Sequence, residues 1–214
     1  MERKNKKDNI AALHKQNIMN AAELVFSEKG FNHATINDIS KAADYSRRTI
    51  YAYFDSKEDI YNHIVLKGLR FLMMELSEGI AAETDFIQQY HAVCKAMTDY
   101  YTTSPHSFDA VNQLETKKID FNHLPKIVSD IFVVGEEINR LLEDLITDGM
   151  NKGVIKADVK VKETVSIIWS CISAILILVK NKGSFIEVAL QTTVDSFLNY
   201  AFNQIINSIL EERI

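Results

Sequence analysis

The sequence predicts an all-α protein with two parts, an N-terminal three-helix domain containing a helix-turn-helix and a longer C-terminal helical domain. Apolar residues recur at helical spacing almost throughout, and no convincing alternating strand pattern is present. The 214 residues include only two prolines and seven glycines, so few positions interrupt a helix. With 47% hydrophobic residues, a chain of this length can bury a substantial core as one or two domains.

The first predicted helix is amphipathic and ends at Gly30, a typical C-terminal stop. Its apolar face carries Ile18, Ala21, Ala22, Val25 and Phe26. We expect this helix to pack against the two short helices that follow and to hold them in place.

The stretch that begins at Thr35 organises the rest of the chain. Thr35 and Asp38 form the pattern of a capping box, which starts a short helix. Residues 44–46 are too few for an independent loop but suffice for a turn, and the serine among them can cap a second helix. The inward side chains of that helix are Ile50 and Phe54, four residues apart. This arrangement predicts a helix-turn-helix.

The outer face of the second helix carries basic and hydroxyl side chains, as a DNA-reading helix requires. Arginine can read guanine edges in the major groove, whereas hydroxyls and tyrosines can bind phosphate oxygens. Two adjacent arginines at the positive end of a helix are unfavourable; they are either simply solvated or explained by a DNA partner. Residues 56–59 form a second capping sequence, which leaves Lys57 near a helix N-terminus where a phosphate can bind. The predicted base contacts are Arg47, Arg48 and Thr49, and the predicted phosphate contacts are Thr35, Ser46, Tyr51, Tyr53 and Lys57.

The charge distribution is compatible with DNA binding despite a net charge of −5. Residues 1–65 hold ten Lys/Arg and nine Asp/Glu, a net of +1, and the remaining chain holds fourteen against twenty, a net of −6. The basic N-terminal stretch MERKNKKD is interpreted as a mobile, solvated tail. The alternative is an arm that contacts the DNA backbone or the minor groove.

Together these segments resemble the N-terminal domain of the TetR/AcrR family of bacterial transcription regulators. The resemblance is carried, in order, by AAELVFSEKGFNHATINDISKAA, the corner DYS, RRTIYAYF and SKEDI. Three positions depart from the family pattern: Tyr45 replaces the usual valine, Arg48 a common glycine, and Tyr53 a frequent histidine. The resemblance implies a dimer that pairs through its last two helices as a four-helix bundle, and a ligand cavity in the C-terminal domain.

The C-terminal part is predicted to be helical as well. A fourth helix runs from residue 56 to about Gly79 and is long enough to belong to both parts, so we place the DNA-binding domain at residues 1–60 and the regulatory domain at 61–214. Residues 84–100 form a fifth helix, and residues 104–123 form a loop with a short helix around 108–114. Pro125 suits the first turn of a long helix that stops near residues 149–153. Gly135 lies inside that helix, where close packing or room for a ligand could explain it.

The last two predicted helices cover residues 160–180 and 186–210, and the first of them is apolar nearly all round in its second half. Its run from Ile167 to Val179 is shorter than the roughly 20 residues that a membrane-spanning helix needs. Because such a helix must be covered on every side, we expect it to pair with a second copy of the chain, without a membrane partner.

Residues 84–180 are the expected place for a small apolar or amphipathic effector. The candidate lining residues are Tyr90, Met97, Tyr101, Phe108 and Phe132. Each of them could equally be an ordinary core residue.

The sequence offers little for catalysis, metals or cofactors. It has no recognisable nucleophile elbow, phosphate loop or dinucleotide fingerprint, so we predict that the protein is not an enzyme and binds no cofactor. His91 and Cys94, with His106 or His123 as a third ligand, are the best metal candidates, but two ligands without a clear third do not predict a site. Cys94 and Cys171 are interpreted as free thiols in a reducing cytoplasm, and no signal peptide is apparent.

The combined interpretation is a dimeric, cytoplasmic transcriptional repressor that binds a palindromic DNA operator and is released by a small-molecule effector. One rival is a DNA-binding regulator whose C-terminal domain binds a protein partner and has no effector cavity. The other is an enzyme or metalloprotein that uses His91 and Cys94.

Overall fold

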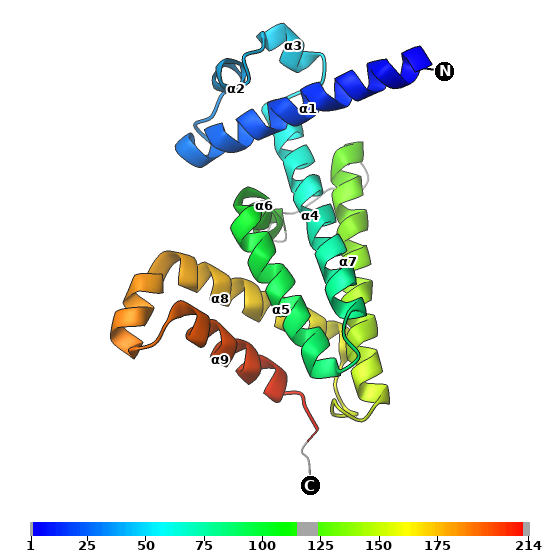
Figure 1. Cartoon of the computed structure of the whole chain (residues 1–214), viewed down its shortest axis with the longest axis vertical. Helices are drawn as coiled ribbons and strands as arrows, with labels where there is room; N and C mark the ends of the chain where they lie inside the picture. Colours follow the sequence, from blue (N-terminus) through cyan, green and yellow to red (C-terminus); the bar gives the residue numbers. More distant parts are fainter. Residues whose placement is uncertain (1, 115–123, 212–214) are drawn as a thin grey trace. The chain divides into compact units, whose positions relative to one another are not determined.

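The computed structural model describes residues 2–114 and 124–211, with side chains at 9–111 and 124–211. The regular elements in these residues are helices, which confirms the all-α prediction (Figure 1). They are α1 (Glu2–Lys29), α2 (Ile36–Ala42), α3 (Arg47–Tyr51), α4 (Lys57–Ala81), α5 (Phe86–Thr103), α6 (Pro105–Leu114), α7 (Lys126–Asn151), α8 (Val161–Leu190) and α9 (Val194–Asn207).

The chain forms two compact units. The first contains Met1–Arg70 and Ser104–Val133, and the second contains Phe71–Thr103 and Val134–Ile214. Helix α4 therefore contributes residues to both units. The functional boundary predicted at residue 60 stays a separate hypothesis, because compactness alone does not define function.

The core of the first unit joins α1, α2, α3 and the start of α4, and we call these four segments the head. In Figure 1, α1, α2 and α3 lie together at the N-terminal end of α4. The buried residues of the head core are Ile18, Ala22, Val25, Phe26, Ala34, Ile39, Ile50, Phe54, Ile60 and Ile64. This set contains most of the apolar face predicted for the first helix, so that helix is the packing partner that the sequence indicated.

The second unit packs α5 against the antiparallel pair α8 and α9. The buried hydroxyl of Tyr90 on α5 donates to the carbonyl of Phe202 on α9 at 2.9 Å. The turn after α7 is tight: a Cβ on Gly149 would lie 2.8 Å from atoms of both Phe86 and Ile155. This steric limit explains a glycine at the end of α7.

The helix boundaries differ most from the predictions in α1 and at the junction of α8 and α9. Helix α1 begins at Glu2, so the basic stretch interpreted as a mobile tail is helical in its backbone. Helix α8 continues to Leu190 across a kink at Lys182 (φ −137°, ψ 18°), where the sequence suggested a loop. The true break comes at Gln191, with φ +50°, followed by Thr193 as the N-cap of α9.

Candidate nucleic-acid interface

The capping box predicted at the start of α2 is present. Thr35 Oγ1 accepts from the Asp38 N–H at 3.2 Å, and an Asp38 carboxylate oxygen accepts from the Thr35 N–H at 3.1 Å. Lys29, at the end of α1, donates to the other Asp38 oxygen at 2.6 Å. These partners, Lys29 first and Thr35 second, lower the pKa of Asp38 to about 2. The result is a charged, fully hydrogen-bonded junction between α1 and α2.

The turn into α3 is defined by backbone conformation and a serine cap. Asp44 has φ +54°, a left-handed conformation that aspartate tolerates better than most residues. Ser46 Oγ accepts from the Thr49 N–H at 3.0 Å, and the Ser46 and Thr49 hydroxyls lie 2.8 Å apart. Both hydroxyls are thus bound inside the first turn of α3, and each keeps lone pairs or a proton for an external partner.

Helix α3 presents the predicted outer face. Arg47, Arg48 and Tyr51 are exposed, whereas Ile50 is buried in the head core. The two arginines therefore lie at the N-terminal end of a short helix that is anchored by one apolar side chain. This is the arrangement in which a reading helix can approach a major groove.

Tyr53, a predicted phosphate contact, lies half-buried after α3 with its ring against α1. Its ring centroid is 5.7 Å from that of His14. His14 also contacts Tyr45 in the turn, through a 2.6 Å hydrogen bond between Nδ1 and the tyrosine hydroxyl. The sequence analysis did not identify His14. Its only signal was its place on α1 one turn before Ile18, on the face that packs against the head.

Lys57 is turned toward the protein. Its Nζ donates to the carbonyls of Phe31 and Ala34 at 2.7 and 3.0 Å and lies 4.4 Å from the centre of the Phe31 ring. The capping sequence that precedes it is half formed: Ser56 Oγ accepts from the Asp59 N–H, but the Asp59 carboxylate accepts from the Asp55 N–H instead of from Ser56. Lys57 therefore has a structural task, fixing the loop before α2, besides any contact with DNA.

The five predicted effector residues are divided between the two units. Tyr90, Met97 and Tyr101 belong to the second unit, and Phe108 and Phe132 belong to the first. Tyr90, Met97 and Phe108 are buried, and Tyr101 and Phe132 are half-buried. Tyr90 borders an apolar cavity of about 20 Å³ within the second unit, which has room for one water at most. Its walls are Tyr90, Val93, Leu142, Leu145, Ile146, Val165 and Ile168.

A larger concavity, of about 660 Å³ and open to solvent, lies at the kink of α8. It is lined by residues 179–185, Glu187 and Val194. The sequence analysis placed a break between its last two helices here, but it did not predict a concavity, which depends on how the kinked segment and the start of α9 pack.

The metal candidates do not form a ligand cluster in the part of the chain that the structure describes, since no group of three or more His, Cys, Asp and Glu side chains converges there. His123 lies outside the described residues. Burial raises the pKa of the Cys94 thiol to about 12. The free thiol is therefore neutral and unreactive in this environment.

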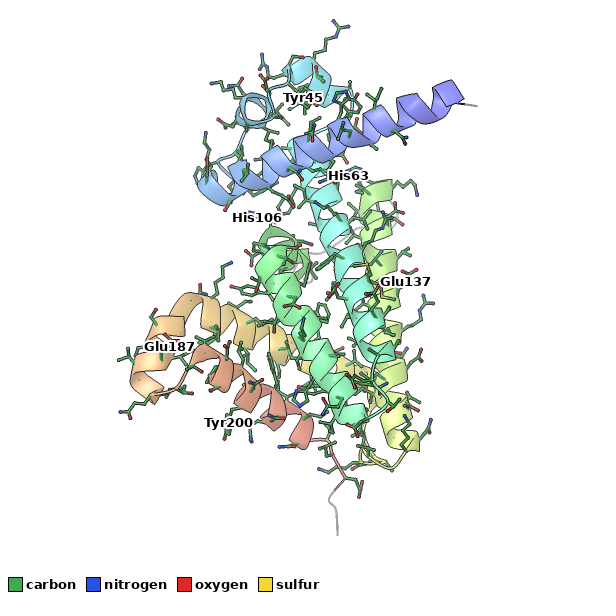
Figure 2. All side chains as sticks on the ribbon, viewed as in Figure 1. Tyr45, His63, His106, Glu137, Glu187 and Tyr200 are labelled. Atoms are coloured by element: carbon green, nitrogen blue, oxygen red, sulfur yellow. The ribbon has the colours of Figure 1, made fainter. Side chains whose placement is uncertain are left out.

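Helix α8 exposes much of its apolar surface. It is long and apolar enough to cross a membrane by length and composition, a criterion that core helices of soluble proteins also meet, and it is the only such helix among the described residues. Only 28% of its most apolar window is buried within one chain. Ile167 is 61% exposed, Phe185 67% and Val188 80%, and Tyr200 on the outer side of α9 is 65% exposed (Figure 2).

Comparisons with known proteins match the head to one family. Residues 18–64 match the family model described as "Bacterial regulatory proteins, tetR family". The chain is 25% identical over 178 residues to the fatty acid metabolism regulator protein of Bacillus subtilis (strain 168), covering 83% of this chain and 89% of the relative. It is 26% identical over 145 residues to the transcriptional repressor KstR2 of Rhodococcus jostii (strain RHA1), covering 68% and 69%.

The fold recurs in a solved structure of a regulator. The structure of FadR from Bacillus subtilis in complex with stearoyl-CoA superposes with a TM-score of 0.70 at 20% identity, covering 91% of this chain and 98% of the other. At this identity the likeness concerns the fold.

Proposed function

Because the chain is a TetR-family transcriptional regulator, we propose that it binds a palindromic DNA operator as a homodimer and represses transcription until an effector releases it. Residues 1–60 serve as the DNA-binding domain and residues 61–214 as the regulatory domain. The observation that carries the proposal is the exposed pair Arg47 and Arg48 on α3, in a head whose caps and turn are formed by its own side chains.

Base contacts are assigned to Arg47, Arg48 and Thr49. Each arginine can reach a guanine edge with a two-pronged hydrogen bond. The phosphate contacts are assigned to Thr35, Ser46, Tyr51, Tyr53 and Lys57, of which Tyr51 is the most exposed tyrosine of the head. Lys57 can take this part only if its ammonium leaves the carbonyls of Phe31 and Ala34 or binds a phosphate with its remaining proton.

Homodimer formation is supported by the apolar surface of α8 and α9. Large side chains such as Ile167, Val188 and Tyr200 are exposed on one chain, and extensive exposed apolar surface is typical of an interaction site. A second copy of the chain is the occupant that also supplies a second head. Two heads about 34 Å apart reach successive major grooves on one side of a palindromic site.

For the effector we propose an amphipathic molecule with a long acyl chain. The support is a relative named a fatty acid metabolism regulator and a solved structure of similar fold in complex with stearoyl-CoA. Because the described cavity beside Tyr90 holds only about 20 Å³, an acyl chain that binds there must open the packing around it. The regulatory domain would then exist in a closed and an open state, and the effector would shift the equilibrium toward the open state.

The route from the effector to the DNA can run through α6 as well as α4. Helix α6 directly follows α5 and lies in the same compact unit as the head. The Tyr61 hydroxyl on α4 donates to the His106 carbonyl at 3.3 Å, and Ser107 Oγ donates to the Val65 carbonyl at 3.0 Å. The His106 ring also packs edge-on against Phe26 of α1. A shift of α6 therefore moves α1 and α4, and a coupling of only about 1–3 kcal/mol changes operator affinity at least several-fold.

The test is selection of bound duplexes from a random-sequence pool by the full-length protein. We expect one palindromic sequence, bound by two chains per duplex. Stearoyl-CoA should then release the protein from the selected duplex, whereas coenzyme A alone should not. A pool that yields no common sequence would contradict the DNA-binding proposal.

A second candidate keeps the DNA-binding head but replaces the effector by a protein partner. The cavity of about 20 Å³ beside Tyr90 favours it, since that cavity is too small for a long acyl chain. Selection of a palindrome without release by stearoyl-CoA, other acyl-CoA thioesters or free fatty acids would support this alternative.

A further inference from the structure

Tyr45 connects the turn of the helix-turn-helix to α1. It lies directly after Asp44, the residue with positive φ, and directly before the cap of α3. Its hydroxyl makes a 2.6 Å hydrogen bond with Nδ1 of His14 and accepts a longer one, 3.4 Å, from the Asn17 side-chain amide. With Asn17 donating to its oxygen, the tyrosine can give its own proton to His14. Figure 2 marks Tyr45 beside α1.

The same turn of α1 also contacts the chain that leaves α3. The His14 ring lies 5.7 Å from the Tyr53 ring at a tilt of 33°, and 5.3 Å from the Tyr45 ring, edge-on. The neighbouring Lys15 ammonium lies 5.6 Å from the centre of the Phe54 ring. Adjacent residues of α1 thus contact the residues that flank α3, before its first residue and after its last.

Helix α3 depends on such outside contacts for its orientation. It has five residues, of which only Ile50 is buried, and Phe54 is buried just after its end. A helix this short is not stable on its own, so its orientation depends on what packs against it and against its flanking residues. The contacts at its two ends restrain that orientation.

We propose that His14 is a positioning residue that sets the orientation of α3 through Tyr45 and Tyr53, and thereby tunes which base pairs the protein prefers. This inference rests on the proposed DNA-binding function. Base contacts tolerate little displacement because their hydrogen bonds require short distances and good alignment. Contacts to phosphates dominate non-specific binding and tolerate displacement better, since they are largely electrostatic.

The test compares Tyr45→Phe, which removes only the hydroxyl, with His14→Ala and the double variant. Binding is measured on the duplex selected by the unmodified protein and on a scrambled duplex. Loss of one hydrogen bond predicts about fivefold weaker binding of Tyr45→Phe to the selected duplex. Binding to the scrambled duplex should change less than about twofold, because it depends on charge. The double variant should bind the selected duplex no worse than His14→Ala, since both substitutions break the same contact.

His33→Ala is the control, because it removes an exposed imidazole from the loop between α1 and α2 and should leave both affinities unchanged. Equal weakening on both duplexes would overturn the proposal in favour of a phosphate contact or partial unfolding. Additive losses in the double variant, or no loss at all, would also overturn it. If His14→Ala does not fold, Tyr45→Phe and Asn17→Ala carry the same comparison. A failure of the proposed function is recognised separately, because the unmodified protein would then select no duplex.

Discussion

The exposed surface of the head and that of the α8–α9 pair differ in chemical character. In the head, the exposed side chains of α3 are arginines and a tyrosine, and the hydroxyls around it are already bound in caps. On α8 and α9, the exposed side chains include Ile167, Val188 and Tyr200. A charged, hydrogen-bonding surface suits a polyanion, and an apolar surface suits another protein. The contrast fits the proposal that the head binds DNA and that α8 and α9 pair with a second copy of the chain.

The largest effect is expected from placing a charge on the apolar surface of α8 and α9. Ile167→Asp and, separately, Tyr200→Asp should convert the proposed dimer to a monomer, because a carboxylate buried without a partner in the interface is strongly unfavourable. A monomer has one head, and losing the second linked contact should weaken binding to the selected duplex by roughly 100-fold or more. Analytical ultracentrifugation and DNA titration measure the two effects.

Leu24→Asp is the matched control for this pair. Leu24 is 64% exposed on α1, so the same change there should leave the protein dimeric. Variants of Ile167 and Tyr200 that remain dimeric at nanomolar concentration would remove α8 and α9 from the proposed interface.

Substitutions at Arg48 test whether the head reads bases. Arg48→Ala should lower affinity for the selected duplex by about 1–3 kcal/mol and relax preference at one base pair. Arg48→Lys keeps the charge but loses the two-pronged geometry, so it should lose the same preference while keeping affinity for a scrambled duplex. Binding measured across all single-base variants of the site reads out this difference. Uniform weakening on every sequence would make Arg48 a phosphate contact.

The two regions also differ in how far the sequence predicts them. The caps at Thr35 and Ser46 were predicted because each depends on residues three positions apart. Such local patterns can be recognised in a sequence without knowledge of the tertiary structure. The contact between His14 and Tyr45 joins residues 31 positions apart, and no local sequence pattern predicts it.

The same reason limits the prediction for Lys57 and for the regulatory domain. Lys57 was placed near a helix N-terminus correctly, yet its ammonium bonds carbonyls 23 and 26 residues earlier in the chain. In the second unit the helices were predicted from their apolar periodicity. The division of the five candidate effector residues between two units depends on how the helices pack, and single-sequence periodicity carries no information on that.

Lys57→Met tests the inward role of this side chain. It should lower the free energy of unfolding by about 1.5 kcal/mol, because two hydrogen bonds from a charged, half-buried group are lost. Lys67→Met, at an exposed position of α4, should change stability little. Chemical denaturation measures both. If Lys57 also binds a phosphate, the slope of log affinity against log salt should fall by about one unit. A loss of stability with an unchanged salt slope would show that Lys57 stabilises the loop before α2 and does not bind a phosphate.

The smallest effect is expected at Gly135, inside α7. A Cβ there would meet no heavy atom of the described residues within 4 Å, so close packing among them does not explain this glycine. Gly135→Ala should therefore raise the free energy of unfolding by about 0.5–1 kcal/mol, since alanine favours a helix over glycine. Gly149→Ala is the opposite case, because its Cβ would clash with Phe86 and Ile155 and should destabilise the protein.

Room for an effector is the remaining explanation of Gly135, and the same variant tests it. An added methyl group in an effector site should weaken release by stearoyl-CoA by roughly fivefold, the effect expected of one misplaced methyl group. Thermal melting and the release titration together separate the outcomes. A variant that gains stability and keeps full release would show that Gly135 serves neither packing nor the ligand. The effector would then have to bind elsewhere in the regulatory domain, and the open concavity at the kink of α8 would be the next place to test.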